Sequence, residues 1–228
     1  MADQRIEKWQ YWIDGTIKNS VLTMHLHRDA WREVAAMLEA NGQLPESYWW
    51  EFMRDTYATT QTVAVRRQAD THKDVASLGK LIEEIRDDPS RITREFWLAE
   101  WTSEDKFLRM EAERGWTTQY AGTVGDHLDP LIPAADFDAL QAASADVRAY
   151  VDQHVAHAER PPRAPSRVTL TLSDIHHDID VIGDLFKKYY NLLTASSYMF
   201  LVPVIQHDWL AIFREPWMRP GGSTVAGD

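Results

Sequence analysis

The sequence contains no cysteine, and this absence excludes several kinds of chemistry at once. A chain without thiols cannot form disulfides, bind a metal through thiolates or use a cysteine nucleophile. The absence also fits a reducing compartment. No apolar run reaches the roughly 18 residues of a membrane span, and "MADQRIEKWQYW" at the start lacks the apolar segment of a signal peptide. We therefore expect a cytoplasmic protein with no membrane partner.

Several familiar catalytic motifs are also missing. We find no glycine-rich phosphate loop, no nucleophile-elbow serine, no helical HExxH motif and no ExxH pair of the di-iron bundles. The nearest approach to an ExxH pair is Asp174 with His177. The other close histidines have spacings that suit neither one helix face nor a shared metal: His25 with His27, and His176 with His177. The sequence therefore predicts neither a metal nor a cofactor.

Basic residues are in the minority. The chain has 24 Lys and Arg residues against 35 Asp and Glu residues, which gives a formal net charge of −11. Proteins that hold nucleic acid through its phosphates usually present a basic face. Any nucleic-acid site in this chain must therefore be a local pocket rather than a broad surface.

Apolar residues are abundant, and they recur at helical spacing. Hydrophobic residues make up 44% of the chain, and the ten tryptophans are suited to packing with one polar edge. Seven helices are predicted, over 16–40, about 45–69, 75–88, 93–101 with Thr93 as its N-cap, 133–159, 173–197, and from about Pro203 onward. The segment 102–132 is either a frayed helix or a mobile insertion. The pattern predicts an all-α fold, a bundle of six or seven helices.

The predicted helices belong to one domain. No linker in the 228 residues separates two self-sufficient cores, so we assign residues 1–218 to a single helical domain. Residues 219–228, "RPGGSTVAGD", are expected to be a disordered tail. Within the domain, "RPPRAPSR" is incompatible with a helix, and "VTLTL" is expected to be an extended arm.

The stretch "YVDQHVAHAERPP", residues 150–162, places two histidines at the end of a predicted helix. His154 follows the apolar side of that helix, and His157 lies beside Tyr150. One interpretation is structural, because the helix dipole favours histidine near a C-terminus. The other is catalytic, because histidine titrates near neutral pH.

The catalytic interpretation gains support from a resemblance. Arg148 precedes His154 with five residues between them, and this resembles the RxxxxH-type signature of the HEPN superfamily. "RRQAD…SLGKLIEEI", a helix that ends in "AH", and the closing helix "DIHHDIDVIGDLFKKYY" follow one another as in the abortive-infection branch of that superfamily. The resemblance covers roughly residues 20–215. It implies a helical bundle and, as in many members, a metal-independent ribonuclease.

The resemblance also implies roles for individual residues. A histidine would transfer protons while the 2′-hydroxyl of RNA attacks its own phosphate, and an arginine would hold that phosphate. Arg148, His154 and His157 are the catalytic candidates, and Asp152 and Tyr150 are candidate binding residues. The resemblance further implies RNA or tRNA as substrate, a cognate antitoxin as partner, and a homodimer in which two copies of the motif face one cleft.

Two alignments of the motif remain open. In the first, Arg148 acts together with His154. In the second, "AH" is aligned and His157 is catalytic, but Val151 then stands where family members commonly carry an arginine. The second alignment favours an inactive binding module that acts through a protein partner or a nucleotide.

Two further arginines are candidate contributors to a basic cleft. Arg66 and Arg67 lie near the end of the second predicted helix, and the alternative is that they only form a solvated helix face. In the homodimer, the predicted helix 133–159 is expected at or near the interface, because one Arg and one His make a poor site alone.

Overall fold

The fold is all-α, as the sequence predicts. The computed structural model describes residues 3–41, 47–101, 105–122, 125–154, 169–203 and 206–215. This part of the chain contains nine α-helices, namely α1 (Gln4–Trp12), α2 (Lys18–Ala40), α3 (Tyr48–Ala69), α4 (Leu78–Asp87), α5 (Arg94–Glu100), α6 (Lys106–Gln119), α7 (Leu131–Ala143), α8 (Ala145–His154) and α9 (Leu172–Thr194). A π-helical turn, Ile13–Ile17, joins α1 to α2, and short 3-10 turns cover Pro89–Arg91 and Trp209–Arg214.

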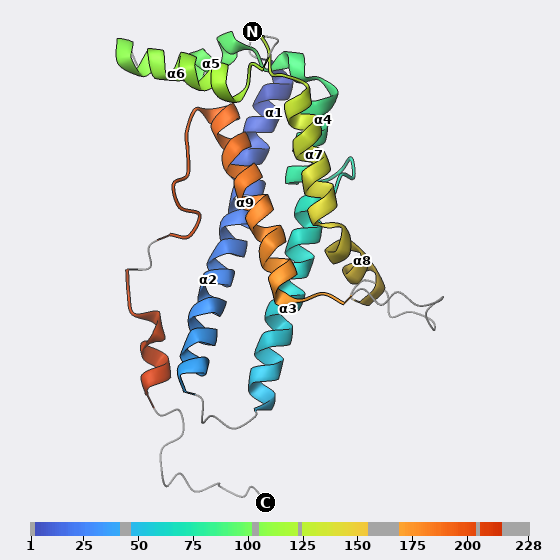
Figure 1. The fold of residues 1–228 in the computed structure, drawn as a ribbon, viewed down its shortest axis with the longest axis vertical. Helices are drawn as coiled ribbons and strands as arrows, with labels where there is room; N and C mark the ends of the chain where they lie inside the picture. Colours follow the sequence, from blue (N-terminus) through green and yellow to red (C-terminus); the bar gives the residue numbers. More distant parts are fainter. Residues whose placement is uncertain are drawn as a thin grey trace, which may run out of the picture.

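The long helices α2, α3 and α9 form the body of the bundle (Figure 1). α9 packs against α1, α2, α3 and α7, while α4 packs against α7. α5 and α6 lie across one end of the bundle, and α8 lies beside α3 (Figure 1). At the other end α2 and α3 continue past the start of α9 as a two-helix extension (Figure 1). We call residues 31–40 and 48–60 the arm.

One hydrophobic core joins these helices. It includes residues from Ile6 on α1 to Leu201 beyond α9. Among the described residues, three tryptophans are fully buried, and each donates its indole N–H inside the fold. The acceptors are Glu84 for Trp9 at 2.9 Å, the Ala112 carbonyl for Trp97 at 3.1 Å and the Gly125 carbonyl for Trp116 at 2.7 Å. These three confirm the expected use of tryptophan as a packing residue with one polar edge.

The helix predicted over 133–159 is two helices in the structure. It breaks at Ser144, where the backbone leaves the helical region with ψ near 2°. The Ser144 hydroxyl donates to the carbonyl of Leu140 at 2.8 Å and competes with the backbone for this acceptor. The consequence is that Arg148 lies on a separate short helix, α8, which can take its own direction.

Other boundaries also differ from the sequence-based expectations. The first helical segment begins at Gln4 rather than near residue 16, and the region 102–132 contains the regular helix α6. Because of these two segments and the break at Ser144, the described chain has more helices than the seven predicted. The helix predicted from Pro203 is a short 3-10 turn instead.

The start of α9 differs as well, while several expected segments fall in undescribed parts of the chain. Thr171 belongs to the segment "VTLTL", which the sequence analysis expected to be extended. In the structure it caps α9 by reciprocal hydrogen bonds with Asp174. The predicted linker 160–167 and the predicted tail 219–228 lie outside the described residues.

Candidate functional site

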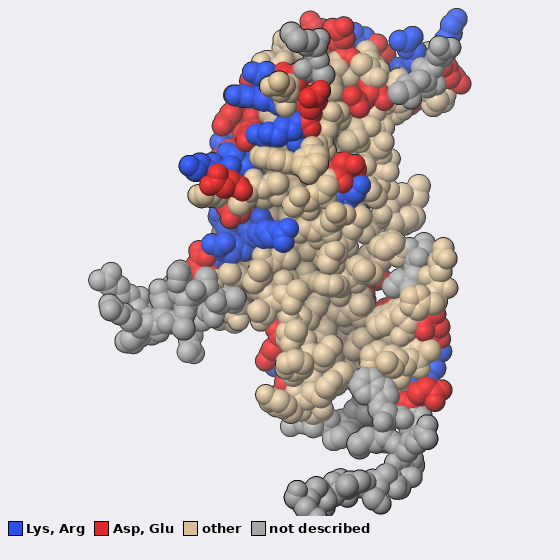
Figure 2. Space-filling view, turned by 180° about the vertical axis from the view of Figure 1, so that it is seen from behind, with Lys and Arg blue, Asp and Glu red and all other residues tan. Residues whose placement is uncertain are grey.

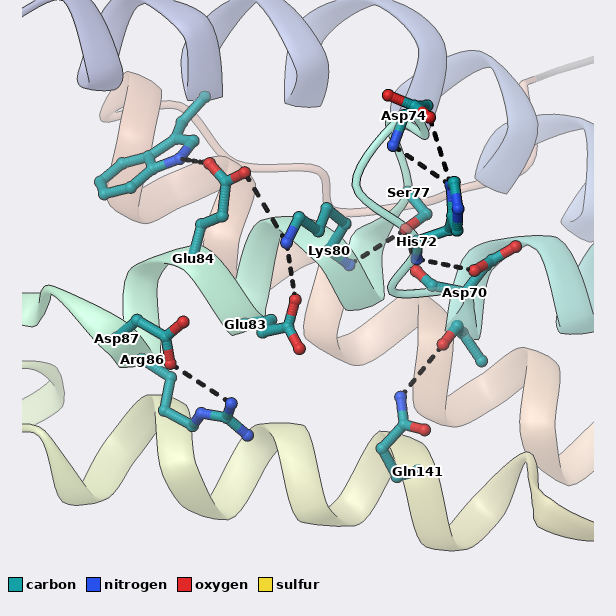
Figure 3. Close-up of polar contacts among 12 residues, drawn as sticks. Asp70, His72, Asp74, Ser77, Lys80, Glu83, Glu84, Arg86, Asp87 and Gln141 are labelled. Carbon is teal, nitrogen blue, oxygen red and sulfur yellow. Dashed lines mark hydrogen bonds and ion pairs between the residues drawn. The ribbon is translucent and has the colours of Figure 1, made fainter.

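Arg148 is fixed where α7, α8 and the end of α3 meet. Its Nη1 donates to Oε1 of Gln141 at 2.5 Å, and its Nη2 donates to the Gln141 carbonyl at 3.4 Å. The amide of Gln141 in turn donates to the carbonyl of Ala69 at 3.1 Å, as Figure 3 shows. Nε of Arg148 is buried without a hydrogen-bond partner, and no carboxylate in the described chain pairs with this guanidinium. Arg148 is therefore a positioned cation that no carboxylate of the described chain neutralises.

One turn further along α8, Asp152 ties the helix to α3. Its Oδ1 accepts a hydrogen bond from Nε of Arg66 at 2.8 Å, and both side chains are partly exposed. The structure thus brings together two of the predicted binding residues. Tyr150 is half-buried and packs against the core. Arg67 faces another side of α3 and lines a hollow between α2 and α3.

Two histidines motivated the catalytic interpretation, and only the backbone of the first is described. His154 is the last residue of α8, and its backbone position is defined. His157 lies outside the described residues. Val151, by contrast, is only 4% exposed within the core. The position that would carry an arginine in the second alignment is thus a core position in this chain.

A second polar cluster, which the sequence did not reveal, connects α2 with α9. Arg28 is 7% exposed. Its Nη1 donates to Oδ1 of Asp180 at 2.6 Å and to the His176 carbonyl at 3.2 Å, and its Nη2 contacts Nδ1 of His25 at 3.0 Å. Because a guanidinium only donates, Nδ1 of His25 accepts, and the ring proton is at Nε2. That Nε2 is buried without an acceptor and lies against Gly183, where an added Cβ would approach it to 2.4 Å.

Aromatic rings extend this cluster toward the arm. The Tyr57 hydroxyl and Nε2 of His176 form a hydrogen bond of 2.8 Å. Trp31 stacks between Trp50 and Tyr57, with ring centroids 4.7 Å apart on each side. This stack and the hydrogen bond attach the base of the arm to the first turns of α9.

Burial sets the protonation of these groups. Desolvation, together with the neighbouring charge of Arg28, lowers the pKa of His25 to about 4. Burial also lowers the pKa of His176 and raises the pKa of Tyr57 to about 12. All three groups are therefore neutral at pH 7. The cluster is organised to hold helices together rather than to exchange protons near neutrality.

Asp178 on α9 shows the opposite behaviour. It is 4% exposed, and burial raises the pKa of its carboxyl to about 7, with Asp174 and Asp146 adding to the shift. A large fraction of Asp178 is protonated at neutral pH.

The sequence contains a signal for the second cluster. It does not lie in the spacings of His25 with His27 and of His176 with His177, which argue against a shared metal. The informative spacings are His25 to Arg28 and His176 to Asp180, which place two polar residues on one face of each helix. Polar residues that interrupt the buried face of a helix indicate a polar contact with another helix, but they do not identify that helix.

Charges of both signs share the described surface. Figure 2 shows Lys and Arg side chains along one side of the upper bundle, the side of α4 and α7 in Figure 1, interspersed with Asp and Glu. Among the described residues, no three His, Asp or Glu side chains gather closely enough to hold a metal ion. None of the described helices combines the length and apolar character needed to cross a bilayer.

Comparison with known proteins identifies the family. No curated protein and no solved structure gave a significant match to this chain. The family model HEPN_AbiU2, described as AbiU2, matches residues 6–212. This match spans nearly all the described helices and agrees with the resemblance seen in the sequence. The chain therefore belongs to the AbiU2 family of HEPN proteins, an abortive-infection-type branch of that superfamily.

Proposed function

We propose that this protein is a metal-independent ribonuclease of an abortive-infection defence system, with its site along α8. The observation that carries the proposal is the state of Arg148. It is held in place by Gln141, it has an unused buried Nε, and no carboxylate in the described chain neutralises it. An arginine fixed in this way is prepared to hold a phosphate and the negative charge that develops on it.

The chemistry needs few groups. The 2′-oxygen of RNA forms a bond to the adjacent phosphorus, and the bond from phosphorus to the 5′-oxygen breaks. A histidine accepts the 2′-hydroxyl proton, and a second acid donates a proton to the leaving 5′-oxygen. In our proposal His154 or His157 fills the first role and Arg148 stabilises the phosphoryl oxygens. No step requires a metal ion.

A homodimer would supply the second acid. Arg148 and His154 are six residues apart, so on a regular helix they point about 120° away from each other. Two copies with their α8 helices facing across one cleft would place a histidine from each copy at the same phosphate. Arg66 lies on the adjacent helix and would add positive charge to such a cleft.

A second function is favoured by one observation. Val151 is buried in the core, so an arginine that the second alignment expects at this position is absent and could not be accommodated without disrupting packing. In that alignment the chain is a non-catalytic binding module that acts through a protein such as an antitoxin. In this alternative the same surface of α8 binds the partner protein, and no reaction is catalysed there.

Cleavage of RNA distinguishes the two functions. The full chain is incubated with tRNA or total RNA in excess EDTA, as wild type and as Arg148→Gln, His154→Ala and His157→Ala. A working general acid or base contributes about 10²–10⁴ in rate. We expect a loss of that order for the working histidine and a comparable loss for Arg148→Gln, with the far-UV circular dichroism unchanged.

Matched controls are available outside the site. His72→Ala removes an exposed histidine from the loop before α4 (Figure 3), and Arg94→Gln removes an exposed arginine that pairs with Glu113 on α6. Both controls should cleave as wild type. Activity abolished by EDTA would contradict the metal-free mechanism. An absence of cleavage in the wild type, together with growth arrest that His157→Ala does not relieve, would favour the binding module.

A further inference from the structure

Arg148 and Asp152 lie one helical turn apart on α8, a spacing at which opposite charges commonly pair. The Cβ atoms of residues i and i+4 are about 5–6 Å apart, so an arginine and an aspartate at this spacing can form an ion pair on the helix surface. In this structure the carboxylate of Asp152 binds Nε of Arg66 at 2.8 Å, and these two described side chains of α8 form no ion pair with each other. The fold thus separates two charges that the helix alone would bring together.

Two contacts with α3 accompany this separation. Arg66 binds Asp152, and three residues later on the same face of α3 the Ala69 carbonyl accepts a hydrogen bond from the Gln141 amide at 3.1 Å (Figure 3). Oε1 of Gln141 in turn accepts a hydrogen bond from Nη1 of Arg148 at 2.5 Å. The two contacts are about 4.5 Å apart along α3, and the two residues of α8 that they hold are about 6 Å apart along α8. Each member of the pair is therefore committed to a different partner.

The start of α4 fixes the α3 end of this arrangement. Gly79 on α4 lies so close to the Ala69 carbonyl that an added Cβ would approach its oxygen to 2.9 Å. The amide N–H of Leu78 donates to Oε1 of Gln68 at 3.2 Å, which ties the first residue of α4 to the last turn of α3. The carbonyl that accepts from Gln141 therefore cannot shift without moving α4.

The order of the charges along α8 explains why one arginine on α3 is enough to take the carboxylate. In a helical ion pair, an acidic residue four positions before a basic one gives the stronger pair, and the reverse order is weaker because it opposes the helix dipole. Arg148 precedes Asp152, so their pair would have the weaker order. Gln141 also holds the guanidinium of Arg148 through two hydrogen bonds. Binding of Asp152 to Arg66 is therefore favoured.

This separation decides how an anion meets α8. A carboxylate at Arg148 would occupy donors that a phosphate needs and would cancel the charge that attracts it. Gln141 offers only neutral acceptors, its Oε1 and its main-chain carbonyl, so it orients the guanidinium and leaves its charge in place. The charge of Arg66 is balanced by Asp152, so the main contribution of Arg66 is to remove that carboxylate from its neighbour on α8.

We propose that Arg66 and Gln141 are positioning residues for Arg148. Arg66 withholds Asp152 from it, and Gln141 orients its guanidinium while its positive charge stays available for a phosphate. The inference rests on the proposed function, in which Arg148 holds a phosphate of RNA. Neither positioning residue touches the reacting atoms.

A double-mutant cycle tests the role of Arg66. Cleavage of tRNA in excess EDTA is compared for the wild type, Arg66→Gln, Asp152→Asn and the double variant. Arg66→Gln should lower cleavage about threefold to tenfold, because the released carboxylate competes with phosphate for Arg148. The double variant should recover most of this loss, since it has no carboxylate to release. An equal loss with and without Asp152→Asn would show that Arg66 contributes only its own charge, and would overturn its role.

Substitution of Gln141 tests the need for a neutral acceptor. Gln141→Glu keeps the shape of the side chain and its contact with the guanidinium but adds a carboxylate, so it should lower cleavage by about tenfold or more. Gln119→Glu makes the same change at an exposed position at the end of α6 and should cleave as wild type. Melting temperatures show that both variants are folded. Undiminished cleavage by Gln141→Glu would contradict the role of Gln141.

Phosphate binding separates a failure of this inference from a failure of the proposed function. The full chain is titrated with inorganic phosphate, and NMR follows the guanidinium N–H signals of Arg148, which are assigned by their loss in Arg148→Gln. Phosphate should shift these signals in the wild type, require a higher concentration in Arg66→Gln, and regain its effect when Asp152→Asn is added.

The titration has distinct outcomes. If it follows this order while the wild type cleaves no RNA, the ribonuclease function fails and the positioning roles stand. Signals that phosphate does not shift in the wild type, or shifts equally in the wild type and in Arg66→Gln, would overturn the positioning roles whatever the cleavage shows.

Discussion

The two ends of α2 and α3 have the same helical backbone but different environments. Toward the bundle, α2 buries Val21, Met24, His25 and Arg28, and α3 buries residues from Gln61 onward. In the arm, residues 31–40 and 48–60, no side chain is buried. The parts of α2 and α3 inside the bundle pack against α9, whereas the arm lies beyond the start of α9 (Figure 1). Helix formation and helix burial are thus separate properties of these two segments.

The difference locates the stability of the fold. Phe186 on α9 is fully buried, while Phe52 in the arm is 56% exposed and Tyr48 is 83% exposed. Apolar area removed from water is the main source of folding free energy. The bundle therefore determines whether the chain folds, and the arm can change with little effect on stability.

The largest expected effect comes from testing this contrast with one residue type. Phe186→Ala should lower the free energy of unfolding by about 3–5 kcal/mol, the usual cost of truncating a buried phenylalanine. Phe52→Ala should change it by less than about 0.5 kcal/mol. Urea titration monitored by circular dichroism gives both values. Similar losses in the two variants would show that something covers the arm in solution.

The boundary between the two regions is the cluster around Arg28. Arg28→Met should lower the free energy of unfolding by about 2–3 kcal/mol, because it removes charge-assisted hydrogen bonds and leaves buried acceptors unpaired. Asp180 remains partly exposed, so its own charge stays hydrated and adds little to the loss. The same urea titration measures the change, with Arg32→Met on the exposed side of α2 as the control.

The pH dependence of stability should reveal two opposing groups. His25 has a pKa of about 4 when folded and about 6.5 when unfolded, so its contribution is lost as the pH falls from 6.5 to 4. Asp178 has a folded pKa of about 7 and an unfolded pKa near 3.8, so its contribution is lost as the pH rises through this range. Between pH 4 and 6.5 the effects of His25 and Asp178 oppose each other, and the lowered pKa of His176 adds to the effect of His25.

Single substitutions separate the pH dependence of stability that comes from His25 from that which comes from Asp178. Asp178→Asn should make the unfolding free energy rise with pH, and His25→Gln should make it fall with pH, each by at most about 1.4 kcal/mol per pH unit. Urea titrations at half-unit steps from pH 4.5 to 6.5 measure the slopes. Identical pH profiles for wild type and both variants would contradict the assigned burial of these groups.

The smallest effect is expected on the surface of the bundle. The ion pair between Arg66 and Asp152 is partly exposed, so Asp152→Asn should cost less than about 1 kcal/mol. Thermal melts at low and high salt would show the difference shrinking as salt increases. A loss comparable with that of Arg28→Met would mean that α8 is held to α3 far more tightly than its exposure suggests.

Helical periodicity predicted the fold well. The repeat of apolar residues placed α3 and α9 to within a few residues, and the Thr93 hydroxyl accepts a hydrogen bond from the Phe96 amide as the expected N-cap. The break at Ser144 was not predicted, because a serine inside an apolar pattern is compatible with a continuous helix. The break depends on the hydrogen bond that the Ser144 hydroxyl forms with the preceding helical turn.

The candidate site was predicted less completely, for a physical reason. The sequence placed Arg148 and Asp152 on one predicted helix, but their partners Gln141 and Arg66 come from other helices. The cluster of Arg28, His25 and Asp180 joins segments about 150 residues apart. Local periodicity contains no information on which helices meet, so contacts between distant helices required the structure.

The close approach of α2 and α9 has a consequence for related sequences. A Cβ at position 183 would come within 2.4 Å of the His25 ring, so glycine at 183 and histidine at 25 depend on each other. Members of the family with a larger residue at 183 should carry a smaller one at 25. Such paired replacement would appear as covariation between two positions that are far apart in the chain. Gly183→Ala should be better tolerated in a His25→Ala background than alone, because the close contact that remains in that background is with Cδ1 of Leu201 at 2.9 Å, the end of a flexible side chain.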